Sequence, residues 1–177
     1  LRRIMDNEQE QVEFWLAGPI PNIPDALQPA AHALLQSERE LKKYTADFPK
    51  ELLWAKVAGR ASVGFHMNHL TGVLDRMLTY AKSESLTDEQ FAFLKQEGAF
   101  NLGTEVEDLR EQFSLKVAEA LAYFKTISEH TLTEKRTVGR KKLPSTLIGL
   151  LFHAAEHSQR HIGQLLVTTS VLQSNIS

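Results

Sequence analysis

Histidine is the residue type in this chain whose placement points most directly to chemistry. Five of the seven histidines fall in two short stretches, residues 66–69 and 153–161. Because His157 and His161 are four residues apart, on an α-helix their rings would lie about 6 Å apart along the axis and on one face. Neutral imidazoles at this spacing can bind one divalent cation. The pair therefore predicts a metal site, with a further ligand from another segment.

That further ligand is expected from the stretch at 66–69, where helical spacing alone does not choose between His66 and His69. Three imidazole ligands would leave positions open to water or substrate, as in Lewis-acid or metal-hydroxide catalysis. Zinc is the expected ion, and nickel and ferrous iron are the alternatives. His66 is the candidate general acid or base, because imidazole titrates near neutral pH.

The composition excludes several other kinds of chemistry. Without cysteine, the chain can form neither a disulfide nor a thiolate metal site, and any thiol chemistry needs an external thiol. A net charge of −2 gives no overall attraction to nucleic acid, and the basic stretch 135–142 is interpreted as a solvated loop. No apolar run reaches the roughly 18–20 residues that span a bilayer. We therefore expect a cytoplasmic protein without a nucleic-acid or membrane partner.

The periodicity of apolar residues predicts the elements that must position these histidines. Steps of three and four residues, typical of one buried helix face, recur in four long segments: residues 25–48, 62–82, 104–128 and 145–173. The histidine stretches lie on the second and the last of these predicted helices. We therefore predict an all-α fold, a four-helix bundle in a single domain over residues 1–177.

Capping patterns and prolines divide the segments. Thr87 with Gln90 predicts the start of an extra short helix, and Thr104 predicts the N-cap of the third long helix. The prolines within 18–24 predict an extended lead-in over residues 1–24. Residues 129–144 are interpreted as a connecting loop with a short extended piece at its centre.

Both histidine stretches resemble motifs of the DinB-like (damage-inducible) superfamily. Residues 62–70, Ser-Val-Gly-Phe-His-Met-Asn-His-Leu, are similar to its second-helix motif, in which a histidine before an aliphatic residue binds metal. His69 is the matching histidine. Residues 157–164, His-Ser-Gln-Arg-His-Ile-Gly-Gln, are similar to its last-helix signature. The resemblance therefore implies His69, His157 and His161 as the ligands.

The resemblance also implies an up-down-down-up bundle, a solvent-open divalent site and a homodimer. The superfamily includes bacillithiol- and mycothiol-dependent S-transferases and hydrolases. The implied function is thus that of a metal-binding protein. It would act as such a transferase or hydrolase on a small-molecule substrate and would use an external low-molecular-weight thiol. The alternative is a non-catalytic protein of the stress response that binds a metal or another small ligand.

Four residues beside the implied ligands have open roles. His66 and His153 each lie one turn before an implied ligand. Each side chain either lines the pocket, contacts a ligand histidine, or packs without a role in the site. Gln164, one turn after His161, is expected to orient a ligand imidazole. Gly163 is expected to permit the close approach of another helix.

Overall fold

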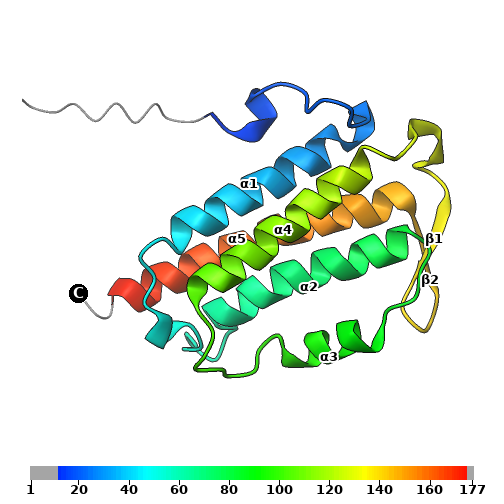
Figure 1. Ribbon diagram of the computed structural model, residues 1–177. Coiled ribbons are helices and arrows are strands. Elements are labelled where there is room, and N and C mark those ends of the chain that lie inside the picture. Colours follow the sequence, from blue (N-terminus) through cyan, green and yellow to red (C-terminus); the bar gives the residue numbers. More distant parts are fainter. Residues whose placement is uncertain (1–11, 175–177) are drawn as a thin grey trace, which may run out of the picture.

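A computed structural model describes residues 12–174 of the chain (Figure 1). The long helices are α1 (Gln28–Tyr44), α2 (Val63–Ala81), α4 (Val106–Phe124) and α5 (Leu147–Ser174), and the short helix is α3 (Asp88–Gln96). Two short strands, β1 (Lys135–Val138) and β2 (Leu143–Thr146), form a hairpin before α5. The predicted all-α class, with four long helices and one short one, is confirmed.

The four long helices form one bundle in which α5 packs against both α1 and α2, and α4 packs on their other side. Helices α1 and α5 run in one direction and α2 and α4 in the other, so the order along the chain is up-down-down-up (Figure 1). The connection from α2 to α4 is long and contains α3. This arrangement places the two histidine-bearing helices, α2 and α5, next to each other.

The core consists of the apolar faces that the helical periodicity predicts. Leu34 of α1, Leu70 of α2, Phe113 of α4 and Leu151 of α5 are all fully buried. Each such side chain contributes about 1.5–3 kcal/mol by leaving water. An apolar core therefore holds the two histidine-bearing helices together.

Of the two predicted helix caps, one is confirmed and the other is wrong. The side chain of Thr87 accepts a hydrogen bond from the Gln90 amide and the Gln90 side chain accepts one from the Thr87 amide, which confirms the predicted capping box of α3. The N-cap predicted at Thr104 is wrong, because α4 begins after Glu105, whose carboxylate pairs with Lys50 instead. Glu107 and Asp108 lie in the first turn of α4, where their negative charges interact favourably with the helix dipole and stabilise the helix.

The loop predicted at residues 129–144 is in part a β-hairpin. Strands β1 and β2 are antiparallel, with Lys135 opposite Thr146 and Val138 opposite Leu143. Arg136 fixes the hairpin to the end of α2, since its Nε donates to the Ala81 carbonyl at 2.7 Å. The hairpin therefore lies across the carboxyl end of α2 (Figure 1).

The first described residues run along α1. The extended lead-in predicted over 1–24 contains a 3-10 turn at Phe14–Leu16, and residues 1–11 lie outside the described part. The guanidinium of Arg39 lies 4.6 Å from the centre of the Phe14 ring, which holds this segment on α1. Between residues 12 and 174, no helix combines the length and apolar character needed to cross a bilayer.

Candidate metal centre

The packing of α2 against α5 brings three of the predicted residues together. His69 of α2 and His157 and His161 of α5 each offer a ligand atom, and these atoms all lie within 4.8 Å of one another. The ring centres of His69 and His157 are 5.2 Å apart, and those of His157 and His161 are 4.6 Å apart. Such a cluster of neutral nitrogen donors could hold one divalent transition-metal ion.

A buried carboxylate fixes the orientation of His69. Its Nδ1 lies 2.7 Å from Oε2 of Glu97, which is 2% exposed and directly follows α3. A neutral His69 that donates from Nδ1 keeps the lone pair of Nε2, and this atom lies 3.0 Å from Nε2 of His157. The carboxylate thereby turns the free ring nitrogen of His69 toward α5, as carboxylates behind metal-binding histidines do.

Glu97 is itself held by a buried ion pair on α2. Its Oε1 accepts a hydrogen bond from Arg76 at 2.7 Å, and the Arg76 side chain is 8% exposed. Gly72 makes room for this pair, because a Cβ at that position would collide with the Glu97 carboxylate and lie 2.8 Å from the Arg76 guanidinium. Thus His69, Gly72 and Arg76, on one face of α2, form a cradle for the end of α3.

His66 contacts another member of the cluster. It is buried, and its Nδ1 lies 2.9 Å from Nδ1 of His161. If His161 bound an ion through Nε2, its Nδ1 would carry the proton and donate a hydrogen bond to His66. His66 would then orient His161 as Glu97 orients His69. The predicted role of His66 beside a ligand stays a prediction.

Burial and mutual proximity favour the neutral form of His66, His157 and His161. Burial, and next the charge of a protonated His69, lower the pKa of His66 to about 4. Burial followed by the other histidines lowers the pKa of His157 to about 4 and that of His161 to about 3. Since a metal binds only unprotonated imidazole, the cluster is prepared for a cation at neutral pH.

One ring nitrogen of the cluster has no protein partner. The buried Nδ1 of His157 has no hydrogen-bond partner among the described residues. A buried polar atom without a protein partner needs a non-protein one, such as water or an ion. The donor set fits a divalent ion coordinated by nitrogen. In such a site Nε2 of His157 would face the ion, and its Nδ1 would carry the proton.

A second group on α5 is a weaker candidate. His153, Glu156 and His157 also offer atoms within 4.8 Å of one another. The Glu156 carboxylate, however, already binds both Arg160, at 2.5 and 2.7 Å, and His153, at 2.8 Å. These contacts lower the pKa of Glu156 against the opposing effect of burial. His153 is therefore engaged with a surface ion pair, beside the cluster rather than in it.

A hollow of about 630 Å³ opens beside His66 on the outer side of the cluster. Arg60 precedes α2 and Arg160 lies on α5, and both line this hollow together with Gln164. The volume is that of a small-molecule site. Arg60, and the donors of Arg160 that do not pair with Glu156, favour a ligand with a negative charge. A small anionic molecule bound in the hollow would therefore lie directly next to His66.

The roles predicted for Gln164 and Gly163 differ from the structure. Gln164 lies on the exposed face of α5, and no described hydrogen bond joins its side chain to an imidazole. Instead, Glu97 contacts His69 and His66 contacts His161. A Cβ at Gly163 would meet nothing within 4 Å, so this glycine does not serve a close helix contact. Gly72 is the glycine that a close contact requires.

The sequence reasoning missed Glu97 because it belongs to a separate short helix, 28 residues after His69. One signal could have indicated it. Arg76 lies seven residues, about two turns, after His69 on a helix that is otherwise largely apolar, and a buried arginine needs a carboxylate partner. The pattern predicts that an acidic residue is present, but not which one.

The chain belongs to the DinB superfamily, whose sequence profile matches residues 33–165. The match extends from α1 to α5 and includes all the histidines of the cluster. No curated protein matches the chain. The resemblance read from the two histidine motifs is thus confirmed at the level of the superfamily.

Proposed function

We propose that the protein binds one divalent transition-metal ion through His69, His157 and His161 and transfers or hydrolyses a group on a small anionic substrate with the help of an external thiol. The observation that supports this most strongly is the convergence of three imidazoles from α2 and α5, with Glu97 and His66 behind two of them. When bound, such an ion lowers the pKa of a coordinated thiol or water, which creates a nucleophile at neutral pH.

The side chains around the cluster would serve binding and orientation. Arg60 and Arg160 would bind a carboxylate or phosphate of the thiol or of its substrate in the neighbouring hollow. Phe65 stacks on His69 with 5.1 Å between the ring centres and 14° between the ring planes, which restricts that ligand further. His66 would act through His161 and, because it also lines the hollow, present a polar group to the substrate.

The test is a thiol-transfer assay on protein produced without a histidine tag. Bacillithiol, mycothiol and cysteine would each be offered with an aryl halide and an epoxide, before and after treatment with a chelator. We expect thiol-dependent turnover that the chelator abolishes and that zinc, nickel or ferrous ion restores. Arg160→Gln is expected to raise KM about tenfold while kcat changes little, because a charged hydrogen bond to the ligand is lost.

Bound metal without turnover on this panel would contradict the proposed transfer and favour the non-catalytic alternative, a protein that binds a metal or small ligand. Absence of bound metal in the intact protein would contradict the proposal altogether. The identity of the ion as zinc, and the homodimer, stay predictions that elemental analysis and light scattering of the same preparation would test.

A further inference from the structure

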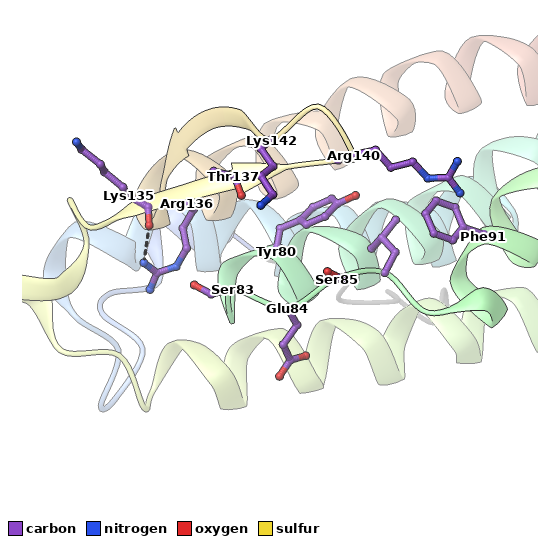
Figure 2. A pocket seen from close by; sticks show the side chains of 12 residues that line it. Tyr80, Ser83, Glu84, Ser85, Phe91, Lys135, Arg136, Thr137, Arg140 and Lys142 are labelled. Carbon is purple, nitrogen blue, oxygen red and sulfur yellow. Dashed lines mark hydrogen bonds between the residues drawn. The ribbon is translucent and has the colours of Figure 1, made fainter.

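A second hollow, of about 530 Å³, lies at the other end of α2, beneath the hairpin (Figure 2). Its wall on the helix side includes Tyr80 and Phe91, and its opposite wall is the hairpin turn with Arg140 and Lys142. Tyr80 lies eleven residues after His69, which places the hollow about 16 Å along the helix axis from the histidines. It is therefore separate from the candidate metal centre.

The hairpin supplies this hollow with cations that lack acidic partners. Five of the eight residues in 135–142 are lysine or arginine. Arg136 is engaged with Ala81, Lys135 and Glu134, whereas Arg140 and Lys142 form no ion pair with any described carboxylate. Glu84 also borders the hollow, but its side chain points away from Lys142 (Figure 2). The wall therefore has a local positive charge that the net charge of the chain does not reveal.

The backbone of the turn holds Lys142 in an unusual conformation. Its φ is +47°, a left-handed value that lysine seldom adopts, and its amide donates to the Gly139 carbonyl at 3.0 Å. Figure 2 shows the Lys142 ammonium directed toward the interior of the hollow, above Tyr80. Strained backbone of this kind is common where a side chain is held for binding.

Aromatic rings complete the lining. The Arg140 guanidinium lies 5.1 Å from the centre of the Phe91 ring, so it is positioned by a cation–π contact rather than by an acid. Its hydrogen-bond donors remain available for an anion, and the Tyr80 ring lies between the two cations in Figure 2. A phosphate fits the Lys142 ammonium, and a flat apolar group fits the rings between the two cations.

From these contacts we infer that the hollow beneath the hairpin binds a small organic phosphate, with the phosphate group at Lys142 and an aromatic or apolar part against Tyr80 and Phe91, beside Arg140. The ligand class is a phosphate monoester on a ring, such as a nucleoside monophosphate. The inference does not depend on the metal centre or on its chemistry.

Calorimetric titration of the intact chain with adenosine monophosphate tests the inference, with adenosine and orthophosphate as partial probes. We expect saturable binding of the monophosphate that is at least tenfold tighter than that of either part. Lys142→Asn is expected to weaken it about tenfold or more, since it removes the charged contact with the phosphate. Arg140→Gln is expected to weaken it less, since it removes the cation beside the rings. Asparagine tolerates the left-handed backbone, so Lys142→Asn keeps the turn intact.

Lys141→Gln is the matched control, because Lys141 lies in the same turn and does not line the hollow. It is expected to leave the affinity within about twofold, since an exposed charge outside the site contributes little. Equal weakening of the affinity by Lys141→Gln would reveal general attraction to polyanions and overturn the inference. Tighter binding of a single-stranded oligonucleotide, with the same loss of affinity in all three variants, would have the same meaning. The absence of saturable binding by the monophosphate would overturn it as well.

Discussion

The histidine cluster and the hollow beneath the hairpin both border α2, but they differ in how their side chains are held. In the cluster, His66 and His69 are fixed by hydrogen-bond partners on other elements. In the hollow, Arg140 and Lys142 project from an exposed turn. Rigid helices suit the strict geometry that an ion demands, whereas a hairpin turn suits an anion that charge alone can attract.

The two regions should therefore respond differently to mutation. A change within the histidine cluster disturbs buried groups that share partners, so its effects should be large and should extend to folding stability. A change in the hollow removes one exposed charge and should leave folding unaffected. Four measurements test this contrast.

The largest effect is expected from the ligands themselves. His69→Ala, His157→Ala or His161→Ala should each weaken metal binding at least about 100-fold, because a three-nitrogen site loses a direct ligand. His66→Ala should weaken it only about tenfold, since His66 acts through His161. Elemental analysis after equilibrium dialysis measures both, and Arg140→Gln serves as the control that retains full metal content. A larger loss in His66→Ala than in His69→Ala would reassign the third ligand.

The second-largest effect is expected from Glu97→Gln. It removes the charge behind His69 and should weaken metal binding about 10–100-fold. It also leaves the Arg76 guanidinium buried without a counter-charge, which should lower the free energy of unfolding by about 3 kcal/mol in the metal-free protein. Urea titration checks the second effect, and Glu111→Gln, on the exposed face of α4, is the control. Unchanged stability would mean that the buried ion pair does not hold α3.

Gly72→Ala compares a crowded helical glycine with an open one. The added methyl group would collide with the Glu97 carboxylate, so we expect a loss of about 1–3 kcal/mol in stability and weaker metal binding. Gly163→Ala, on α5, has open space and should be neutral or stabilising by up to about 1 kcal/mol. Thermal unfolding of the two variants measures the contrast. Equal effects would show that the cradle on α2 adapts easily.

The smallest effect is expected from pH. Because folding lowers the pKa of His66 and His157 from 6.5 to about 4, the unfolded chain binds more protons between these values. The free energy of unfolding in the metal-free protein should therefore fall as pH decreases from about 6.5, by roughly 1–2 kcal/mol after allowance for solvent screening. Urea midpoints at pH 7, 6 and 5 measure this slope. His157→Gln should reduce it and His32→Gln should not.

Much of the fold could be predicted from the sequence because local signals specify it. The capping box at Thr87 and the start of the second long helix at residue 62 were both predicted correctly, since each depends on residues within one turn. The last helix was placed almost correctly, starting at Leu147 rather than Ser145. The hairpin was not foreseen, because its strands of four residues are too short for a clear alternating pattern and are fixed by Arg136 and Ala81, which are far apart in sequence.

For the site, the sequence by itself determined that His157 and His161 share a helix face, because four residues make about one helical turn. It also showed that any metal must be bound by nitrogen or oxygen, since no cysteine is present. The tertiary structure alone decided that His69 lies opposite His157 while His66 faces His161 and that Glu97 reaches His69 from another element. These contacts depend on how α2, α3 and α5 pack, and spacing along one helix contains no information about them.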